Sequence, residues 1–212
     1  MKYIVYLFVA ACISSANAAS DAELFQAVIR DDVRALGQAV ARGADPNATD
    51  EGGQPALAKA LFLESYDAAM ALARTPALDV QRRNRAGETG LMLAALKGRE
   101  DIVRVLLERG AAADPDGWTP LHYAAAGGSR AIVTLLLARG VRVDARAPNG
   151  RTPLMMAAGF AAEEVVDDLL RAGADPAARD SQGTGAADFA RHGGRDWLGE
   201  KLEAAVAQRR TR

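Results

Sequence analysis

The sequence has 212 residues but only one cysteine and two histidines. The single cysteine, Cys12, cannot form an intrachain disulfide or a site with several thiolate ligands. The histidines, His122 and His192, lie far apart, and no HExxH or Cys–His spacing accompanies them. These absences exclude a disulfide-stapled fold and a recognisable zinc site, and the sequence predicts no metal and no cofactor.

Aromatic residues make up 5% of the chain, and the formal net charge is −1 at pH 7. Because the chain has no overall positive field, binding to nucleic acid is not expected. Hydrophobic residues reach 50%, and many are alanines, which let helices pack closely. This composition favours an all-α fold with a sizeable core. The 22 arginines against 4 lysines, with the excess of alanine, indicate a GC-rich bacterial genome.

Residues 1–18 have the layout of a secretory signal peptide. Lys2 precedes an apolar run, and Ala16-Asn17-Ala18 forms a small-x-small cleavage pattern. The apolar run is too short for a transmembrane helix, which needs roughly 20 residues. We expect cleavage after Ala18, export to the periplasm and no membrane insertion afterwards. The alternative is a lipoprotein box that ends at Cys12, which would anchor the protein to the envelope through a lipid.

The rest of the chain repeats a short pattern. Five glycines begin similar segments, and an alanine follows seven residues after each. Their spacings of 34, 30, 33 and 33 residues are typical of a repeat array. The glycines are Gly53, Gly87, Gly117, Gly150 and Gly183, and the alanines are Ala60, Ala94, Ala124, Ala157 and Ala190.

Each unit contains two expected helices. Residues 100–110 and 130–140 carry apolar residues at helical spacing and end in a glycine, which suits a left-handed C-cap. Thr119 and Thr152 precede Pro120 and Pro153, as expected for an N-cap followed by proline at the first helical position.

The run Thr119-Pro120-Leu121-His122-x-Ala124 and the 33-residue period resemble the ankyrin repeat. The resemblance implies an all-α solenoid of stacked helix-turn-helix units with β-turn finger loops. Residues 21–43 are expected to form an N-terminal capping helix pair, residues 44–208 five repeats including the C-terminal cap, and residues 209–212 a basic tail. Only the third repeat keeps the whole signature, and its loop from Gly110 to Gly117 is shorter than those of its neighbours.

The candidate catalytic groups have simpler structural explanations. The resemblance implies that Thr119 and His122 hydrogen-bond locally and tie neighbouring repeats together, and no nucleophile and base surround them. His192 is expected at a helix end. The acidic residues of segment 163–168 lie on an outer helix, where a solvated face is favoured over a hydrolytic or calcium site. The glycines do not form a phosphate loop.

In ankyrin proteins the variable contacts lie just after the finger glycine and at the end of the inner helix. Trp118 draws attention because tryptophan is enriched in binding hot spots, although it could instead pack against the next repeat. The basic stretch Arg82, Arg83 and Arg85 is either a solvated loop or an anchor for an acidic protein patch. The candidate partner-binding residues are Trp118, Arg151, Glu88, Arg82, Arg83, Arg85, Phe62, Phe160, Lys97 and Tyr123.

The sequence therefore predicts a non-catalytic, monomeric, exported module that binds another protein through its concave face and fingers. Narrower versions are an inhibitor or immunity-type protein and a protective accessory for a periplasmic enzyme. The alternatives are a lipid-anchored envelope scaffold, which a lipidated Cys12 would indicate, and a hydrolase that uses the acidic cluster around Glu163.

Overall fold

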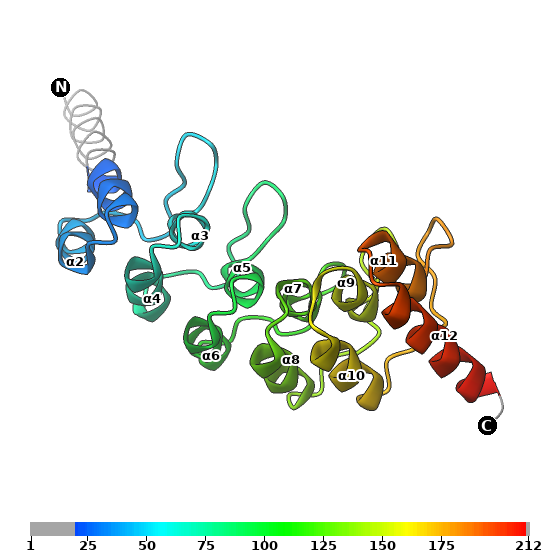
Figure 1. Cartoon of the computed structure of the whole chain (residues 1–212). Helices are drawn as coiled ribbons and strands as arrows, with labels where there is room; N and C mark the ends of the chain where they lie inside the picture. The colour runs from blue at the N-terminus through cyan, green and yellow to red at the C-terminus, as the bar shows by residue number, and fades with distance from the viewer. Residues whose placement is uncertain (1–19, 211–212) are drawn as a thin grey trace, which may run out of the picture. The chain divides into compact units, whose positions relative to one another are not determined.

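The computed structural model describes residues 20–210. These residues form helices joined by loops, which confirms the predicted all-α repeat fold class (Figure 1). The predicted signal peptide at residues 1–18, with Cys12, lies outside the described residues, as do residues 211–212 of the expected tail. The chain divides into two compact units, one up to Gly90 and one from Leu91 onward.

The first unit contains a helical segment at residues 20–29, then α2 (Val33–Ala41), α3 (Ala56–Phe62) and α4 (Tyr66–Arg74). Asp32 caps α2 because its Oδ1 atom accepts a hydrogen bond of 2.9 Å from the Ala35 backbone N–H. The preceding Asp31 has a positive φ of 53° and accepts a 2.7 Å hydrogen bond from the Ala68 N–H in α4. The turn before α2 therefore also caps a helix of the next repeat.

The second unit holds four helix pairs, each with an inner and an outer helix. In Figure 1, α7, α9 and α11 form one row, and α6, α8 and α10 form another. The helices are α5 (Gly90–Leu96), α6 (Glu100–Glu108), α7 (Pro120–Gly127), α8 (Arg130–Leu137), α9 (Pro153–Phe160), α10 (Glu163–Arg171), α11 (Ala186–His192) and α12 (Asp196–Arg210). Helix α12 runs through Arg210, so it includes Arg209, where the sequence predicts a tail.

The core is built from the repeating pattern itself. The outer helices α6, α8 and α10 each bury two β-branched residues and a leucine, such as Ile102, Val103 and Leu106 on α6. The inner helices bury small residues, such as Ala124 and Ala125 on α7. Alanine brings the inner helices close together, while the larger outer residues fill the space behind them.

The fingers are the loops that join one repeat to the next inner helix. Three of them close as hairpins through isolated β-bridges between Thr49 and Pro55, Arg83 and Thr89, and Arg179 and Gly185. The shortened loop before Trp118 has no bridge of this kind. The third repeat therefore lacks the projecting hairpin of these three repeats.

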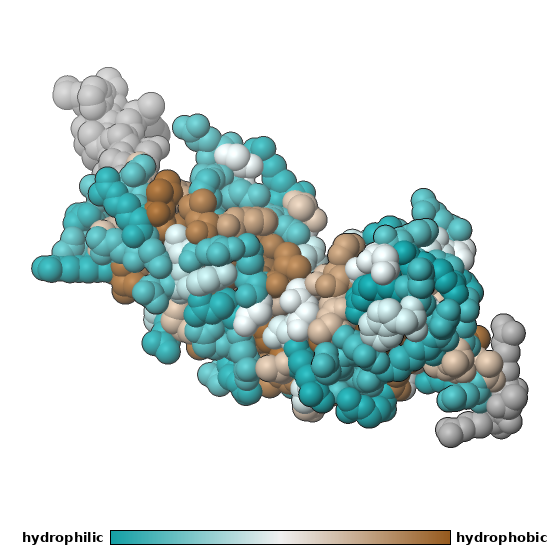
Figure 2. All heavy atoms as spheres, viewed as in Figure 1, coloured by the Kyte–Doolittle hydropathy of each residue, from teal (hydrophilic) through white to brown (hydrophobic). Residues whose placement is uncertain are grey.

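Most of the visible surface is hydrophilic, and hydrophobic residues gather near α3 on the face in Figure 2. The large hydrophobic side chains that remain most exposed include Phe160 at 67%, Ile29 at 51% and Trp197 at 50%. No helix in residues 20–210 combines the length and the apolar character that crossing a membrane requires.

Candidate partner-binding surface

His122 is completely buried at the start of α7 and joins two repeats. Its Nδ1 atom lies 2.9 Å from Thr119 Oγ1 and 3.2 Å from the Thr119 backbone nitrogen. Its Nε2 atom lies 3.0 Å from the Arg151 carbonyl oxygen, 29 residues further along the chain. These are the local and inter-repeat hydrogen bonds that the ankyrin resemblance implies.

These partners define the protonation state of His122. The Arg151 carbonyl can only accept, so Nε2 carries the hydrogen and Nδ1 accepts from Thr119. Burial lowers the pKa of His122 below its ordinary value of 6.5, and the hydrogen bond to Arg151 opposes this effect only in part. A neutral imidazole with both nitrogens engaged has no free base for catalysis.

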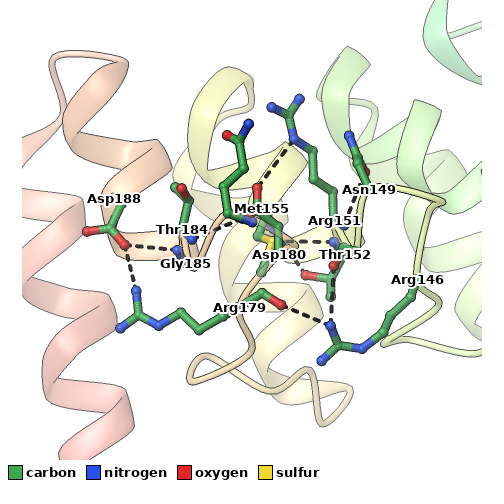
Figure 3. Close-up of polar contacts among 12 residues, drawn as sticks. Arg146, Asn149, Arg151, Thr152, Met155, Arg179, Asp180, Thr184, Gly185 and Asp188 are labelled. Atoms are coloured by element: carbon green, nitrogen blue, oxygen red, sulfur yellow. Dashed lines mark hydrogen bonds and ion pairs between the residues drawn. The ribbon is translucent and has the colours of Figure 1, made fainter.

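In two later repeats, a different side chain accepts the hydrogen bond that His122 Nδ1 accepts in the third repeat. The Thr152 N–H donates to the Met155 Sδ atom at 3.4 Å, and the Gly185 N–H donates to Asp188 Oδ2 at 2.9 Å (Figure 3). In α7, α9 and α11 the third residue of the inner helix thus accepts a hydrogen bond from the residue before the helix. Its chemical identity can vary because the scaffold needs only an acceptor there.

Trp118 is half-buried, so its side chain does not project fully into solvent. Its ring meets the rings of His122 and Tyr123 edge-on, at centroid distances of 5.2 and 6.3 Å. Beside it is an open hollow of about 240 Å³, which we call the Trp118 socket. The socket is lined by Leu96, Trp118, His122, Tyr123, Ala126 and Met156.

Two features leave the socket open. The missing hairpin removes the finger that precedes Trp118, and Ala126 and Gly127 place almost no side-chain volume at the end of α7. A Cβ atom on Gly127 would lie 2.2 Å from the Leu96 carbonyl oxygen, so α5 and α7 approach too closely there for any side chain. The socket wall is therefore fixed by backbone packing.

In the next repeat, the residue at the position of Trp118 contacts other side chains of the fold. Arg151 occupies the place of Trp118, and its guanidinium lies 4.9 Å from the centre of the Phe189 ring. Its Nε atom lies 3.8 Å from Asp180 Oδ2 in an ion pair (Figure 3). Arg151, predicted as a partner contact, is thus already engaged within the fold, and 34% of its side chain remains exposed.

The remaining predicted contacts lie at the ends of inner helices and in the fingers. Phe62 ends α3 with 44% of its surface exposed, and Phe160 ends α9 with 67% exposed. Lys97, Glu88 and Tyr123 are partly exposed. His192 is exposed at the last residue of α11, as the sequence predicts.

The basic stretch belongs to the second finger, in the first unit. Arg82, Arg83 and Arg85 are all exposed. The Arg83 Nη1 atom donates a 2.6 Å hydrogen bond to the Gly87 carbonyl oxygen. The structure does not bring these arginines and the Trp118 socket into one unit.

The expectation that the acidic cluster is a solvated face is wrong for Asp168. This carboxylate is buried, accepts a 2.6 Å hydrogen bond from Arg130 on α8 and also pairs with Arg171. The hydrogen bond from Arg130 lowers the pKa of Asp168 despite its desolvation. Glu163 and Asp167 both pair with Lys201 of α12, at 2.5 and 2.6 Å. Three of the four acids, Glu163, Asp167 and Asp168, thus pair with cations, and these pairs join α10 to α8 and α12.

Sequence reasoning did not single out Met156 and Ala126 as lining residues. Met156 lies six residues after Gly150, as Tyr123 lies six after Gly117, so the repeat register could have identified it. The socket itself depends on the shortened finger and on the approach of α5 to α7, which no local pattern reveals. Within residues 20–210, no cluster of three or more His, Cys, Asp or Glu side chains could hold a metal ion.

The comparisons with known proteins agree with this architecture. The family described as ankyrin repeats (3 copies) matches residues 24–116 and 110–180. Mouse B-cell lymphoma 3 protein homolog is 37% identical over 114 residues, which are 50% of this chain and 25% of that protein. Mouse 2-5A-dependent ribonuclease is 43% identical over 81 residues, 35% of this chain and 11% of that protein.

A plant relative shows the same pattern. The Arabidopsis thaliana ankyrin repeat-containing protein ITN1 is 38% identical over 123 residues, 56% of this chain and 19% of that protein. This chain thus spans a quarter or less of each of these three relatives, and their activities are not transferred with the repeats. Since the family match covers most of the chain, the protein belongs to the ankyrin repeat family.

Proposed function

We propose that this protein is an exported, non-catalytic binding module that holds a partner protein in the Trp118 socket. Ankyrin repeats are protein-interaction modules, so the family supports the general role. The observation that carries the specific proposal is the open hollow beside Trp118, about 240 Å³ in volume. In the next repeat, Arg151 stands at the position of Trp118 and its guanidinium packs on the Phe189 ring.

The chemistry of the socket suits one bulky apolar side chain. Leu96, Ala126 and Met156 provide apolar walls, and Trp118 and Tyr123 provide ring edges. Methionine adapts its shape to different occupants, and tryptophan is enriched among residues that dominate binding energy. Phe160, which is exposed four residues after Met156 on the same helix, extends the apolar surface.

Crosslinking in an envelope extract tests this proposal. A photoreactive phenylalanine analogue replaces exposed Phe160, and captured proteins are quantified with and without the change Ala126→Leu, which fills the socket. We expect Ala126→Leu to remove one captured protein and Trp197→Ala, on exposed α12, to retain it. If both variants capture the same protein equally while their melting curves match the unmodified protein, the socket is not the binding site.

Mass spectrometry of the mature N-terminus tests export. A chain that begins at Ala19 supports release into the periplasm, whereas a lipid on Cys12 supports the anchored alternative. An intact chain that begins at Met1 and remains in the cytoplasm would exclude both. The narrower roles, an inhibitor or immunity-type protein and a protective accessory, depend on whether the captured partner is an enzyme that the purified protein inhibits or stabilises.

A further inference from the structure

The second finger, residues 82–89, concentrates positive charge that the fold does not use. Arg82, Arg83 and Arg85 are exposed, and none of them forms an ion pair within the described chain. Two other cations of the first unit are paired: Arg42 lies 2.5 Å from Glu23, and Lys59 lies 2.9 Å from Asp50. Arg30, Arg34 and Arg74 form no ion pair in the described residues either, so what distinguishes the second finger is that it places three exposed arginines within residues 82–85. The three arginines are therefore available for a group outside the molecule.

The hairpin that carries them is rigid. Asn84 is buried, and its Oδ1 atom accepts hydrogen bonds from the Ala86 and Glu88 N–H groups at 3.0 and 2.9 Å. A β-bridge joins Arg83 to Thr89. The buried amide thus holds the turn from inside, and the backbone that carries the arginines does not have to be ordered when a partner binds.

Two of the arginine side chains are also positioned by backbone contacts. Arg83 is held on the Gly87 carbonyl oxygen. Arg85 lies across Gly53 of the first finger, where a Cβ atom would meet its Nε atom at 2.3 Å. Glycine at position 53 leaves the space that the Arg85 side chain occupies, and this contact places a guanidinium beside the first finger.

Guanidinium groups match carboxylates with two parallel hydrogen bonds. The Glu88 carboxylate of the same finger accepts a 2.8 Å hydrogen bond from the buried Asn84 amide, and no ion pair of the described residues joins a carboxylate to any of the three arginines. Nucleic acid fits less well, since the chain has a net charge of −1 and no aromatic residue lies in the finger for base stacking.

We propose that Arg82, Arg83 and Arg85 bind an acidic segment of a partner protein. This inference rests on the proposed function and adds the chemistry of the partner: its contact segment carries Asp or Glu residues. The finger adds charge selectivity and faster association, because exposed charges act mainly on encounter rate and on the choice of partner.

Fluorescence anisotropy with synthetic probes tests the inference without the natural partner. The full mature chain is titrated into a labelled peptide of alternating Glu and Ser, its Gln-for-Glu counterpart and an oligothymidine of equal length. We expect the Glu peptide to bind at least about tenfold more tightly than the other two at low salt. Raising the salt from about 50 to about 300 mM should weaken binding severalfold because exposed charges are screened.

The variant Arg82→Glu/Arg85→Glu should lower affinity for the Glu peptide by about tenfold or more. The matched control is Arg34→Glu/Arg74→Glu, which makes the same charge change at two exposed arginines of the same unit that carry no ion pair. Affinity that falls equally in both variants, or an oligothymidine that binds more tightly than the peptide, overturns the inference. None of these substitutions touches the Trp118 socket, so the proposed function is tested separately: equal crosslinking with and without Ala126→Leu would refute it, whatever the affinity for the Glu peptide.

Discussion

The Nε2 atom of His122 lies 3.0 Å from the carbonyl oxygen of Arg151, and this contact fastens α7 to the finger that precedes α9. The residue that best resembles a catalytic histidine therefore acts as a buried connector between repeats. Its neighbours that could contact a partner, Trp118 and Tyr123, are partly exposed, and the Trp118 ring contacts the rings of both His122 and Tyr123.

Replacing His122 by alanine should lower the free energy of unfolding by about 2–4 kcal/mol. The change leaves a cavity and removes the partners of a buried Thr119 N–H and the Arg151 carbonyl. Urea denaturation followed by circular dichroism measures the loss. His122→Met should cost less, about 1 kcal/mol, because Met155 already fills this position in the next repeat. Because methionine cannot donate to the Arg151 carbonyl, no loss of stability in His122→Met would contradict the connector role.

Acid should destabilise the protein through His122. The pKa of His122 in the folded protein lies below 6.5, the ordinary value that it has in the unfolded chain. As the pH falls below 6.5, His122 therefore becomes protonated in the unfolded chain before it does in the folded protein. The free energy of unfolding should therefore decrease as the pH falls from about 7 toward 5, by no more than about 1.4 kcal/mol per pH unit. The slope should be shallower in His122→Met, which keeps exposed His192. Identical slopes would show that His122 does not titrate in this way.

The repeating pattern predicted the fold well because its signals are local. The glycines at 110, 140 and 173 do adopt positive φ, and Thr119 and Thr152 do precede helices that begin with proline. Each of these features depends on one or two dihedral angles. Where α12 ends could not be predicted in this way, since Arg209 is held by the distant Gly173 carbonyl at 2.8 Å.

The candidate site was predicted less completely. The register correctly placed Arg151 beside a finger, but its engagement with Phe189 and Asp180 depends on the side chains of the following repeat. The sequence predicts that Asp168 is an exposed acid on an outer helix, but in the structure Arg130 of the neighbouring helix α8 pairs with it. Both differences arise from contacts more than 25 residues apart in sequence, which periodicity does not encode.

Gly127→Ala should destabilise the second unit, by about 2 kcal/mol or more. The added Cβ atom would overlap the Leu96 carbonyl oxygen at 2.2 Å and push α5 away from α7. Gly37→Ala is the control, because Gly37 lies within α2 with no atom within 4 Å of its Cβ position. That change should stabilise the protein by about 0.5–1 kcal/mol, since alanine favours the helix. Thermal melts of the pair should therefore shift in opposite directions, and a shared direction would argue against a rigid socket wall.

Asp168→Asn should lower the free energy of unfolding by about 1 kcal/mol, because it removes charge-assisted hydrogen bonds while Arg130 and Arg171 stay solvated. The pKa of Asp168 is lowered from 3.8, so its stabilising effect is present above that pH and is lost as the pH falls below it. The difference between Asp168→Asn and the unmodified protein should therefore shrink below about pH 4, a window separate from that of His122. The exposed neighbour Glu164→Gln should change stability by less than about 0.5 kcal/mol. A difference that stays constant down to pH 2 would mean that Asp168 acts through packing and not through its charge.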